Sequence, residues 1–332
     1  MTEVKNILLV NPPWRKEKGN IWRNVAGIVP PLGLASLAAV GEHAGKNVSI
    51  IDAQALQLNE TETADAISSA PADLIGFTAT TPIVNTAYRL ARRARDAHSG
   101  ALIVFGGPHV TALPGEPFEH VPGCIVARGE ADITFGELIS SENIGNLDGI
   151  SVQRNGAIVH NPAKPLVEDI NSLPAPAYHL LPLDRYRPSL GNYRKLPALG
   201  IVATRGCYGR CRFCYRETFG NKVRAISADN LIGQLEMLYK DFGIRDVQFY
   251  DDIFLGDKKS IREFCEKMIY SRSRMIWLCN MRAELSTPEI LKLMRRAGCY
   301  MVDYGVESGS PEVLNSMKKN APLDRTIESI RM

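Results

Sequence analysis

The sequence has no long apolar run, little net charge and few cysteines, and each shortage excludes a class of protein. Its apolar stretches are far shorter than the roughly 18 to 20 residues that a membrane span requires, and its first residues do not resemble a signal peptide. We therefore expect a cytoplasmic protein without a transmembrane segment. A net charge of +3 over 332 residues gives no argument for a nucleic-acid partner or a membrane surface. Seven cysteines are too few for a disulfide scaffold.

The first half of the chain alternates short apolar runs with helix-like segments. The apolar runs have the length of strands and occupy residues 7–10, 48–51, 74–77, 102–105 and 124–127. The helix-like segments lie between them, at residues 33–44, 60–69, 85–98 and 133–138. Nearly continuous apolar strands are typical of a parallel sheet that is covered on both faces. The pattern predicts an α/β domain with a doubly wound, Rossmann- or flavodoxin-like sheet over residues 1–145.

The loops that follow these strands are rich in glycine, proline and hydroxyl side chains. In a doubly wound sheet the ligand lies beyond the carboxyl ends of the strands. The candidate contact residues there are Thr78, Thr80, Gly106, Gly107, Arg128, Gly129 and Glu130. No G-x-G-x-x-G motif follows the first strand, which disfavours a standard dinucleotide site. The same residues also suit ordinary turns, so these loops by themselves leave ligand binding undecided.

A hairpin and a proline-rich stretch come next. Residues 150–154 and 157–160 flank the Asn155-Gly156 pair, which is typical of a tight hairpin turn. Proline is frequent from residue 173 to residue 182, which favours a stiff, extended connector. We therefore expect a linker over residues 146–193 and a second domain over residues 194–332.

Three of the seven cysteines lie within eight residues. Cys207, Cys211 and Cys214 follow a predicted strand at residues 199–204 and have C-x3-C-x2-C spacing. Three thiolates this close can converge on one metal centre and leave one coordination position open, as in an iron–sulfur cube with one iron that lacks a protein ligand. Two alternatives are a zinc site, with Cys279 or Cys299 as the fourth ligand, and three unligated core cysteines.

This spacing, with Phe213 directly before the last cysteine, resembles the cluster loop of the radical S-adenosylmethionine (SAM) superfamily. The first half resembles the cobalamin (B12)-binding domain that precedes the barrel in one large branch of that superfamily. Segments that carry this second resemblance are residues 30–34, 106–109 and 128–130. The branch includes B12-dependent radical SAM methyltransferases and anaerobic magnesium-protoporphyrin monomethyl ester cyclases. The resemblance covers nearly the whole chain.

The resemblance implies a role for individual residues. Cys207, Cys211 and Cys214 would hold a [4Fe–4S] cluster whose unique iron SAM chelates, and the loops of the first domain would contact cobalamin. The implied SAM contacts are Tyr250, Asp251 and Asp252 near the amino group, Arg282 at the carboxylate, and Glu307 and Ser308 near the ribose or methionine. The usual D-x-H-x-x-G motif is absent after the first strand, so the resemblance implies cobalamin without a histidine ligand from that loop.

The remaining strands carry polar residues on one face. In the predicted strands 246–252, 275–282 and 300–307 these are Gln248, Tyr250, Asp252, Asn280, Arg282, Asp303 and Glu307. Polar side chains in buried parallel strands are costly unless they have partners. A cavity at the C-terminal mouth of a β/α barrel would account for all three strands at once. The alternative is that these residues face water at sheet edges.

A complete radical SAM barrel has six βα units, whereas the sequence predicts four strands before Met332. We therefore expect an incomplete barrel, either a fragment of a longer protein or one that a partner completes. The expected function is B12-dependent radical SAM methylation or oxidative cyclisation at an unactivated carbon of a small-molecule substrate, with flavodoxin or ferredoxin as electron donor. Two alternatives are a radical SAM enzyme that does not use B12 and a non-catalytic corrinoid- and iron–sulfur-binding module.

Overall fold

The computed structural model describes residues 3–14 and 27–332. The chain divides into two compact units. The first contains Met1–Val167 and Ser172–Tyr186, and the second contains Glu168–Asn171 and Arg187–Met332. No helix in the described part of the chain is both long and apolar enough to span a membrane.

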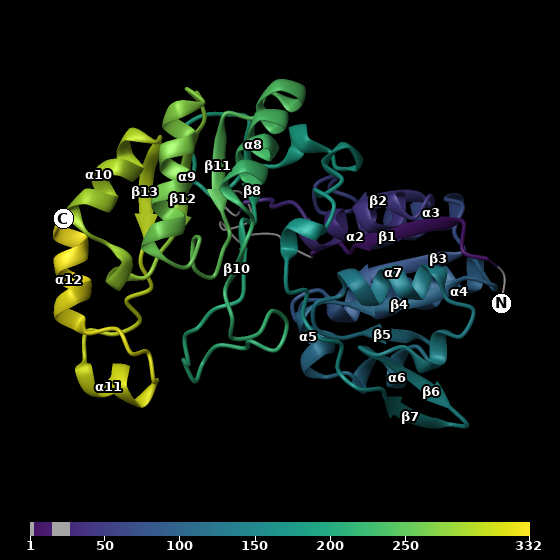
Figure 1. The fold of residues 1–332 in the computed structure, drawn as a ribbon. Coiled ribbons are helices and arrows are strands. Elements are labelled where there is room, and N and C mark those ends of the chain that lie inside the picture. Colours follow the sequence, from purple (N-terminus) through teal and green to yellow (C-terminus); the bar gives the residue numbers. More distant parts are fainter. Residues whose placement is uncertain (1–2, 15–26) are drawn as a thin grey trace. The chain divides into compact units, whose positions relative to one another are not determined.

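The first unit is built on a seven-stranded sheet with the order β2-β1-β3-β4-β5-β6-β7 (Figure 1). Its strands are β1 (Asn6–Asn11), β2 (Asn47–Asp52), β3 (Leu74–Thr78), β4 (Leu102–Gly106), β5 (Ile125–Ala127), β6 (Ile150–Arg154) and β7 (Ala157–His160). The first five are parallel. The order 2-1-3-4-5 is that of the flavodoxin-like doubly wound sheet, with a switch of direction between β1 and β3. The predicted fold class of the first domain is confirmed.

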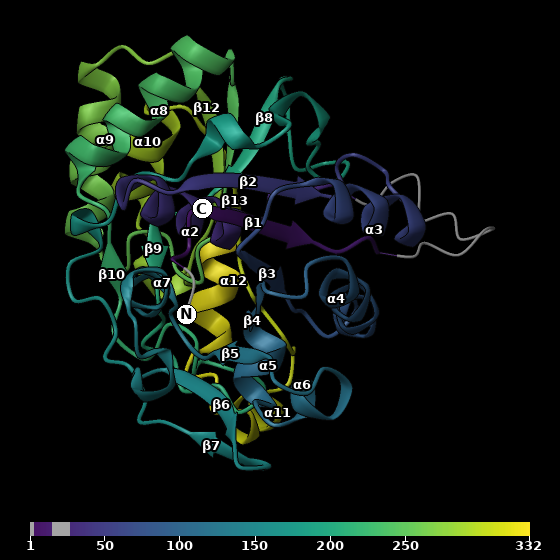
Figure 2. The same cartoon turned by 90° about the vertical axis from the view of Figure 1, so that its right-hand side faces the viewer.

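Helices cover both faces of this sheet because successive side chains of each strand point to opposite sides. Leu8, Val10 and Phe105 pack in a core with helices α3 and α4. Leu9 and Val104 pack in a second core with α2 and α7, and Figure 2 shows these two pairs on opposite sides of the strands. The helices of this unit are α2 (Leu32–His43), α3 (Glu60–Ser69), α4 (Val84–Ala97), α5 (Pro108–Ala112), α6 (Glu116–His120) and α7 (Asp132–Ser140).

The predicted hairpin forms, but it belongs to the first sheet and not to a linker. Strand β6 pairs antiparallel with β5, and β7 pairs with β6. The hairpin thereby covers the edge that β5 would otherwise expose. The connector that follows folds back on the same unit, where the Tyr186 hydroxyl donates a hydrogen bond to the buried Asp52 carboxylate at 2.7 Å. The structure thus extends the first unit well beyond the predicted boundary at residue 145.

The second unit contains a four-stranded parallel sheet with the order β13-β12-β11-β8. Its strands are β8 (Ala198–Ile201), β11 (Asp246–Phe249), β12 (Ile276–Asn280) and β13 (Cys299–Asp303). The helices are α8 (Ala228–Phe242), α9 (Lys258–Tyr270), α10 (Pro288–Arg296), α11 (Pro311–Ser316) and α12 (Leu323–Arg331). Phe264 of α9 packs edge-on against Phe249 and Trp277, with ring centroids 5.8 and 5.5 Å apart. Strands that neighbour one another in chain order, each followed by a helix, form the predicted partial β/α barrel.

Three of these strands end earlier than the sequence predicts. Strands β11, β12 and β13 stop at Phe249, Asn280 and Asp303, so the predicted site residues from Tyr250 to Glu307 lie in the loops beyond them. Glu307, which the sequence places in the last strand, has a φ of +64°, a conformation outside strand geometry. The Phe254 amide donates to the Asn280 carbonyl, which turns the chain across the end of β12.

Candidate functional site

The three clustered cysteines lie on a loop that a short strand pair closes. Strands β9 (Thr204–Arg205) and β10 (Arg224–Ala225) pair antiparallel, and we call residues 206–223 between them the cysteine loop. Gly206 begins it with a φ of +85°, and a Cβ at this position would lie 2.8 Å from the Phe219 carbonyl oxygen. The Cys207 amide donates to the Gly220 carbonyl at 3.3 Å. Only glycine allows the chain to turn this tightly after β9.

Two sulfur atoms of the loop, those of Cys207 and Cys211, lie beside Gly209. A Cβ on Gly209 would lie 3.2 Å from the Cys207 sulfur and 3.8 Å from the Cys211 sulfur. The Gly209 amide donates to the Cys207 sulfur at 3.3 Å. Burial and the neighbouring Cys211 and Cys207 thiols raise the pKa of Cys214, which is exposed. The donor set of three cysteine thiols on one short loop, with the Cys207 sulfur already hydrogen-bonded and Cys214 exposed, is of the kind that holds a cluster with one coordination position open.

Cys279 and Cys299 do not support the zinc alternative. They lie on adjacent strands, β12 and β13, and both are buried. Burial and a hydrogen bond with Cys299 raise the pKa of the Cys279 thiol well above its ordinary value. Among the described residues, no three His, Cys, Asp or Glu side chains are grouped to ligate a single ion, and this holds for the cysteine loop as well as for Cys279 and Cys299. Cys279 and Cys299 are therefore core residues.

Asp251 is buried behind the cysteine loop. Its carboxylate accepts hydrogen bonds from the Ala203 amide at 2.7 Å, the Thr204 amide at 3.0 Å and the Thr204 hydroxyl at 3.2 Å. It is 1% exposed, and burial raises its pKa to about 7. The predicted SAM contact at this position thus has its carboxylate oxygens directed into the protein.

Its two neighbours have different surroundings. The Tyr250 ring covers Gly200, where a Cβ would overlap it, and burial raises the pKa of Tyr250 to about 12. Asp252 is exposed and has no hydrogen-bond or ion-pair partner among the described residues. Its charge contributes to the raised pKa of Cys214, which places it near the cysteine loop. Asp252 is therefore the carboxylate of this segment that remains free for a ligand.

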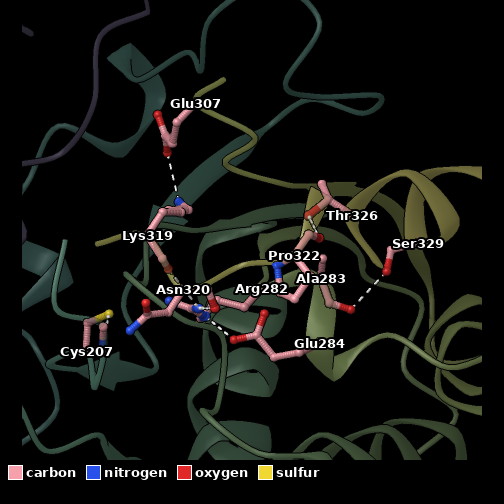
Figure 3. A network of polar contacts seen from close by, with 11 residues as sticks. Cys207, Arg282, Ala283, Glu284, Glu307, Lys319, Asn320, Pro322, Thr326 and Ser329 are labelled. Atoms are coloured by element: carbon pink, nitrogen blue, oxygen red, sulfur yellow. Dashed lines mark hydrogen bonds and ion pairs between the residues drawn. The ribbon is translucent and has the colours of Figure 1, made fainter. Parts of the chain in front are cut away.

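Arg282 joins three segments of the second unit (Figure 3). Its Nε pairs with the Glu284 carboxylate, and its Nη2 donates to the carbonyls of Lys319 and Asn320 at 3.4 and 3.3 Å. Its guanidinium carbon lies 5.4 Å from the centroid of the Tyr208 ring in the cysteine loop. The predicted partner of the SAM carboxylate is thus already bonded on several sides.

The stretch between α11 and α12, residues 317–322, packs on the cysteine loop. The Arg212 amide donates to the Met317 carbonyl at 2.8 Å, and the Lys319 ammonium lies 5.9 Å from the centroid of the Phe213 ring. The same ammonium pairs with Glu307 at 2.9 Å (Figure 3). Sequence reasoning missed Lys319, because it stands in no recognisable motif and is twelve residues from its partner.

The remaining residues predicted in the second unit are Ser308 and polar residues of strands β11 and β13. The Ser308 hydroxyl accepts a hydrogen bond from the Ser310 amide at 3.0 Å, and α11 begins directly afterwards. Gln248 is 7% exposed, and its Oε1 has no hydrogen-bond partner among the described residues. Burial also raises the pKa of Asp303. These acceptors lie on or next to strands β11 and β13, and the cavity at the mouth of the barrel remains a prediction.

In the first unit, the loops after β3 and β4 are tied together. Gly107 has a φ of +110°, and a Cβ there would lie 2.8 Å from the Ala79 carbonyl oxygen. The Ala79 amide donates to the Gly106 carbonyl at 2.7 Å. Thr78 and Thr80 flank Ala79, are half-buried, and have hydroxyls without a hydrogen-bond partner among the described residues. At this edge of the sheet the backbones of the two loops lie close together, and two threonine hydroxyls are free to contact a ligand.

In the loop after β5, unlike the loops after β3 and β4, polar side chains are bonded to other parts of the first unit. Arg128 donates to the backbone carbonyls of Ile150, at 3.1 Å, and Asn161. The Gly129 amide donates to the Thr111 hydroxyl at 3.0 Å. Glu130 is 5% exposed and accepts from the Val167 amide at 2.9 Å. The side chains of Arg128 and Glu130 therefore hold the hairpin and the connector and point away from a ligand role.

Comparison with known proteins finds a match for each of the two units. The sequence matches the B12 binding domain over residues 21–139 and the radical SAM superfamily over residues 201–332. An uncharacterized methyltransferase of Pyrococcus horikoshii, PH0819, is 32% identical over 99% of this chain, which spans 71% of that protein. The chain belongs to the B12-binding radical SAM family. The family's two domains imply a [4Fe–4S] cluster, SAM and cobalamin as cofactors, as the sequence predicted.

Other relatives of this B12-binding radical SAM chain are more distant. The anaerobic magnesium-protoporphyrin IX monomethyl ester cyclase of Rubrivivax gelatinosus is 25% identical over 98% of the chain, which spans 60% of the cyclase. The cobalamin-dependent SAM radical enzyme OxsB, with aqua-cobalamin and SAM bound, superposes with a TM-score of 0.83 at 21% identity, over 99% of this chain and 47% of OxsB. The radical SAM methyltransferase TsrM of Kitasatospora setae gives a TM-score of 0.77 at 18% identity, over 98% of this chain and 65% of TsrM. These likenesses confirm the predicted fold class.

Proposed function

We propose that this chain catalyses, alone or within a longer protein, a cobalamin-dependent radical SAM reaction that methylates or cyclises a small molecule at an unactivated carbon. The observation that carries the proposal is the cysteine loop, in which the sulfurs of Cys207 and Cys211 flank Gly209 and Cys214 is exposed beside them. The family's B12 binding domain in the same chain supports cobalamin as the second cofactor.

Cys207, Cys211 and Cys214 would hold the cluster. When bound, the cluster and SAM supply a 5′-deoxyadenosyl radical, and cobalamin supplies a carrier for a methyl group. The protein's own contribution is to bind, to orient and to exclude water. The Gly209 amide, which donates to the Cys207 sulfur, would stabilise a thiolate there.

Charged groups at the cysteine loop suit the amino and carboxylate groups of the SAM methionine. Asp252 is an unpartnered carboxylate and would accept from the amino group. The methionine carboxylate needs a cation, and Arg282 is already bonded to Glu284 and two carbonyls. Lys319 pairs with one carboxylate, that of Glu307. It is therefore the better candidate to leave its partner and pair with the SAM carboxylate. Glu307 and Ser308 would then lie near the ribose or methionine, as the resemblance implies.

In the first unit, cobalamin would lie on the loops beyond β3, β4 and β5. Thr78 and Thr80 offer free hydroxyls, and Gly106, Gly107 and Gly129 allow the backbone to approach a large ring. Arg128 and Glu130 would support this loop from behind through the hairpin and connector. An electron donor of the flavodoxin or ferredoxin type and a cytoplasmic location complete the proposal.

Anaerobic reconstitution with iron and sulfide tests the proposal. We expect about four iron and four sulfide per chain, and 5′-deoxyadenosine after addition of SAM and dithionite. Cys211→Ala should abolish both, whereas Cys265→Ala, which alters a buried cysteine of α9, should keep both. A full cluster in the Cys211→Ala variant would contradict the proposal that Cys211 holds the cluster. Cluster and corrinoid binding without 5′-deoxyadenosine would instead indicate a non-catalytic module, and a cluster without corrinoid would indicate an enzyme that does not use B12.

A further inference from the structure

Asp251 sits behind the segment from which the cysteine loop starts. Its carboxylate accepts three hydrogen bonds from Ala203 and Thr204, and Gly206 opens the loop two residues after Thr204. From these contacts we infer that Asp251 is a positioning residue, which fixes the base of the cysteine loop and makes no contact with SAM. This inference rests on the proposed function, because it concerns the loop that would hold the cluster.

The same contacts extend to two other segments. The Thr204 hydroxyl accepts from the Leu255 amide at 2.9 Å while it donates to Asp251. The Asn280 side-chain amide donates to the Asp251 backbone carbonyl at 3.3 Å. The ends of β8, β11 and β12 are thus joined at one buried point, directly below the loop. A shift of the Asp251 carboxylate would be transmitted to Thr204 and from there to Cys207.

The geometry suits a carboxyl group with two oxygens at this place. Both carboxylate oxygens of Asp251 face donors, two amides and one hydroxyl. In Asp251→Asn with its oxygen on the two amides, the NH2 group faces the Thr204 hydroxyl, which must then accept from both this group and the Leu255 amide while its own proton loses its acceptor. Groups that orient metal ligands from behind typically change metal affinity by roughly 10- to 100-fold when they are removed.

Asp246 provides a matched control on β11, the strand that precedes Asp251. It is also 1% exposed, and it accepts from the Arg194 amide at 2.6 Å, the Lys195 amide at 3.0 Å and the Tyr300 hydroxyl at 3.1 Å. It lies at the start of β11, whereas Asp251 lies beyond its end. Asp246→Asn should therefore destabilise the second unit to a similar degree without a direct effect on the cysteine loop.

The experiment uses the full chain, reconstituted anaerobically with iron and sulfide. Iron loss to a ferrous chelator and the electron paramagnetic resonance spectrum of the reduced cluster, with and without SAM, are measured for the wild type, Asp251→Asn and Asp246→Asn. Thr204→Val and Thr204→Ser form a second pair, in which only serine keeps the hydroxyl. We expect iron loss roughly tenfold faster or more in Asp251→Asn, an intermediate effect in Thr204→Val, near wild-type behaviour in Thr204→Ser and a wild-type spectrum in Asp246→Asn.

The outcomes separate a positioning role of Asp251 from a purely structural role and from a contact with SAM. If Asp251→Asn and Asp246→Asn lose iron equally fast and have the same spectrum, Asp251 has no special relation to the cysteine loop and the inference fails. If Asp251→Asn keeps the wild-type cluster but no longer changes its spectrum on SAM addition, Asp251 is a SAM contact and the inference also fails. If the wild type itself holds no cluster, the proposed function fails. Should Asp251→Asn not fold, the two Thr204 variants still test the inference.

Discussion

At the scale of single residues, a side chain at Gly209 would interfere with groups beside the cysteine sulfurs. A Cβ there would lie 3.1 Å from Arg282 Nη1 and 3.2 Å from the Cys207 sulfur. We expect Gly209→Ala to push these groups apart and to lower cluster retention severalfold, with little change in the free energy of unfolding. Gly233→Ala in α8 is the control, because no atom lies within 4 Å of that Cβ, and it should stabilise the helix by about 1 kcal/mol. Iron content and urea unfolding of both variants check this prediction, and equal iron content would contradict it.

Asp251 also makes stability depend on pH. Its pKa in the folded protein, about 7, lies above the ordinary value of 3.8 because it is buried. Between these two values the unfolded chain has lost the proton while the folded chain still holds it, so the free energy of unfolding falls as pH rises. We expect the stability of the wild type relative to Asp251→Asn to decrease from about pH 4 to about pH 7 and to be constant above that. Urea unfolding at several pH values measures it, and a constant difference over this range would refute the raised pKa.

At the scale of elements, the connector at the end of the first unit depends on one buried hydrogen bond. Tyr186 donates to Asp52, which also accepts from the Asn11 side chain at 2.8 Å and lies at the end of β2. Tyr186→Phe should cost about 1–3 kcal/mol, because a buried carboxylate loses one donor. Tyr270→Phe, at a hydroxyl on a side chain that is 91% exposed, should cost almost nothing. Chemical unfolding with a probe in the first unit distinguishes the two, and equal stability would show that the connector is not anchored there.

The positions of the strands could be predicted from the sequence, whereas their ends could not. Apolar runs such as residues 74–77 identify buried parallel strands because both faces of the sheet are covered. The ends of β11 to β13 depend on hydrogen bonds between distant segments, such as that from Phe254 to Asn280, and these leave no local pattern. For the same reason the hairpin after residue 149 was placed in a linker, although its pairing with β5 makes it part of the sheet.

At the scale of the whole molecule, the ligand residues with short spacing were predictable and their partners were not. Cys207, Cys211 and Cys214 lie within eight residues, so sequence alone brings them together. Lys319 reaches the cysteine loop only because residues 317–322 pack on it, and Asp251 turns inward only because Ala203 and Thr204 present donors. Such relations arise from tertiary contacts over tens of residues, which a single sequence does not display.

The two units should lose their cofactors independently. Gly107 has a φ of +110° and no room for a Cβ, which would lie 2.8 Å from the Ala79 carbonyl oxygen, so Gly107→Ala must displace the loops after β3 and β4. We expect this variant to lose bound cobalamin and to keep its iron–sulfur cluster, because the cysteine loop belongs to the other unit. Gly123→Ala is the control for backbone strain, since Gly123 has a φ of +76° but nothing within 4 Å of its Cβ. It should keep both cofactors after reconstitution with iron, sulfide and cobalamin, as measured by corrinoid absorbance and iron content.

Cobalamin binding by Gly107→Ala at the wild-type level would exclude the loops after β3 and β4 as its site, and loss of iron together with cobalamin would show that the two sites are coupled.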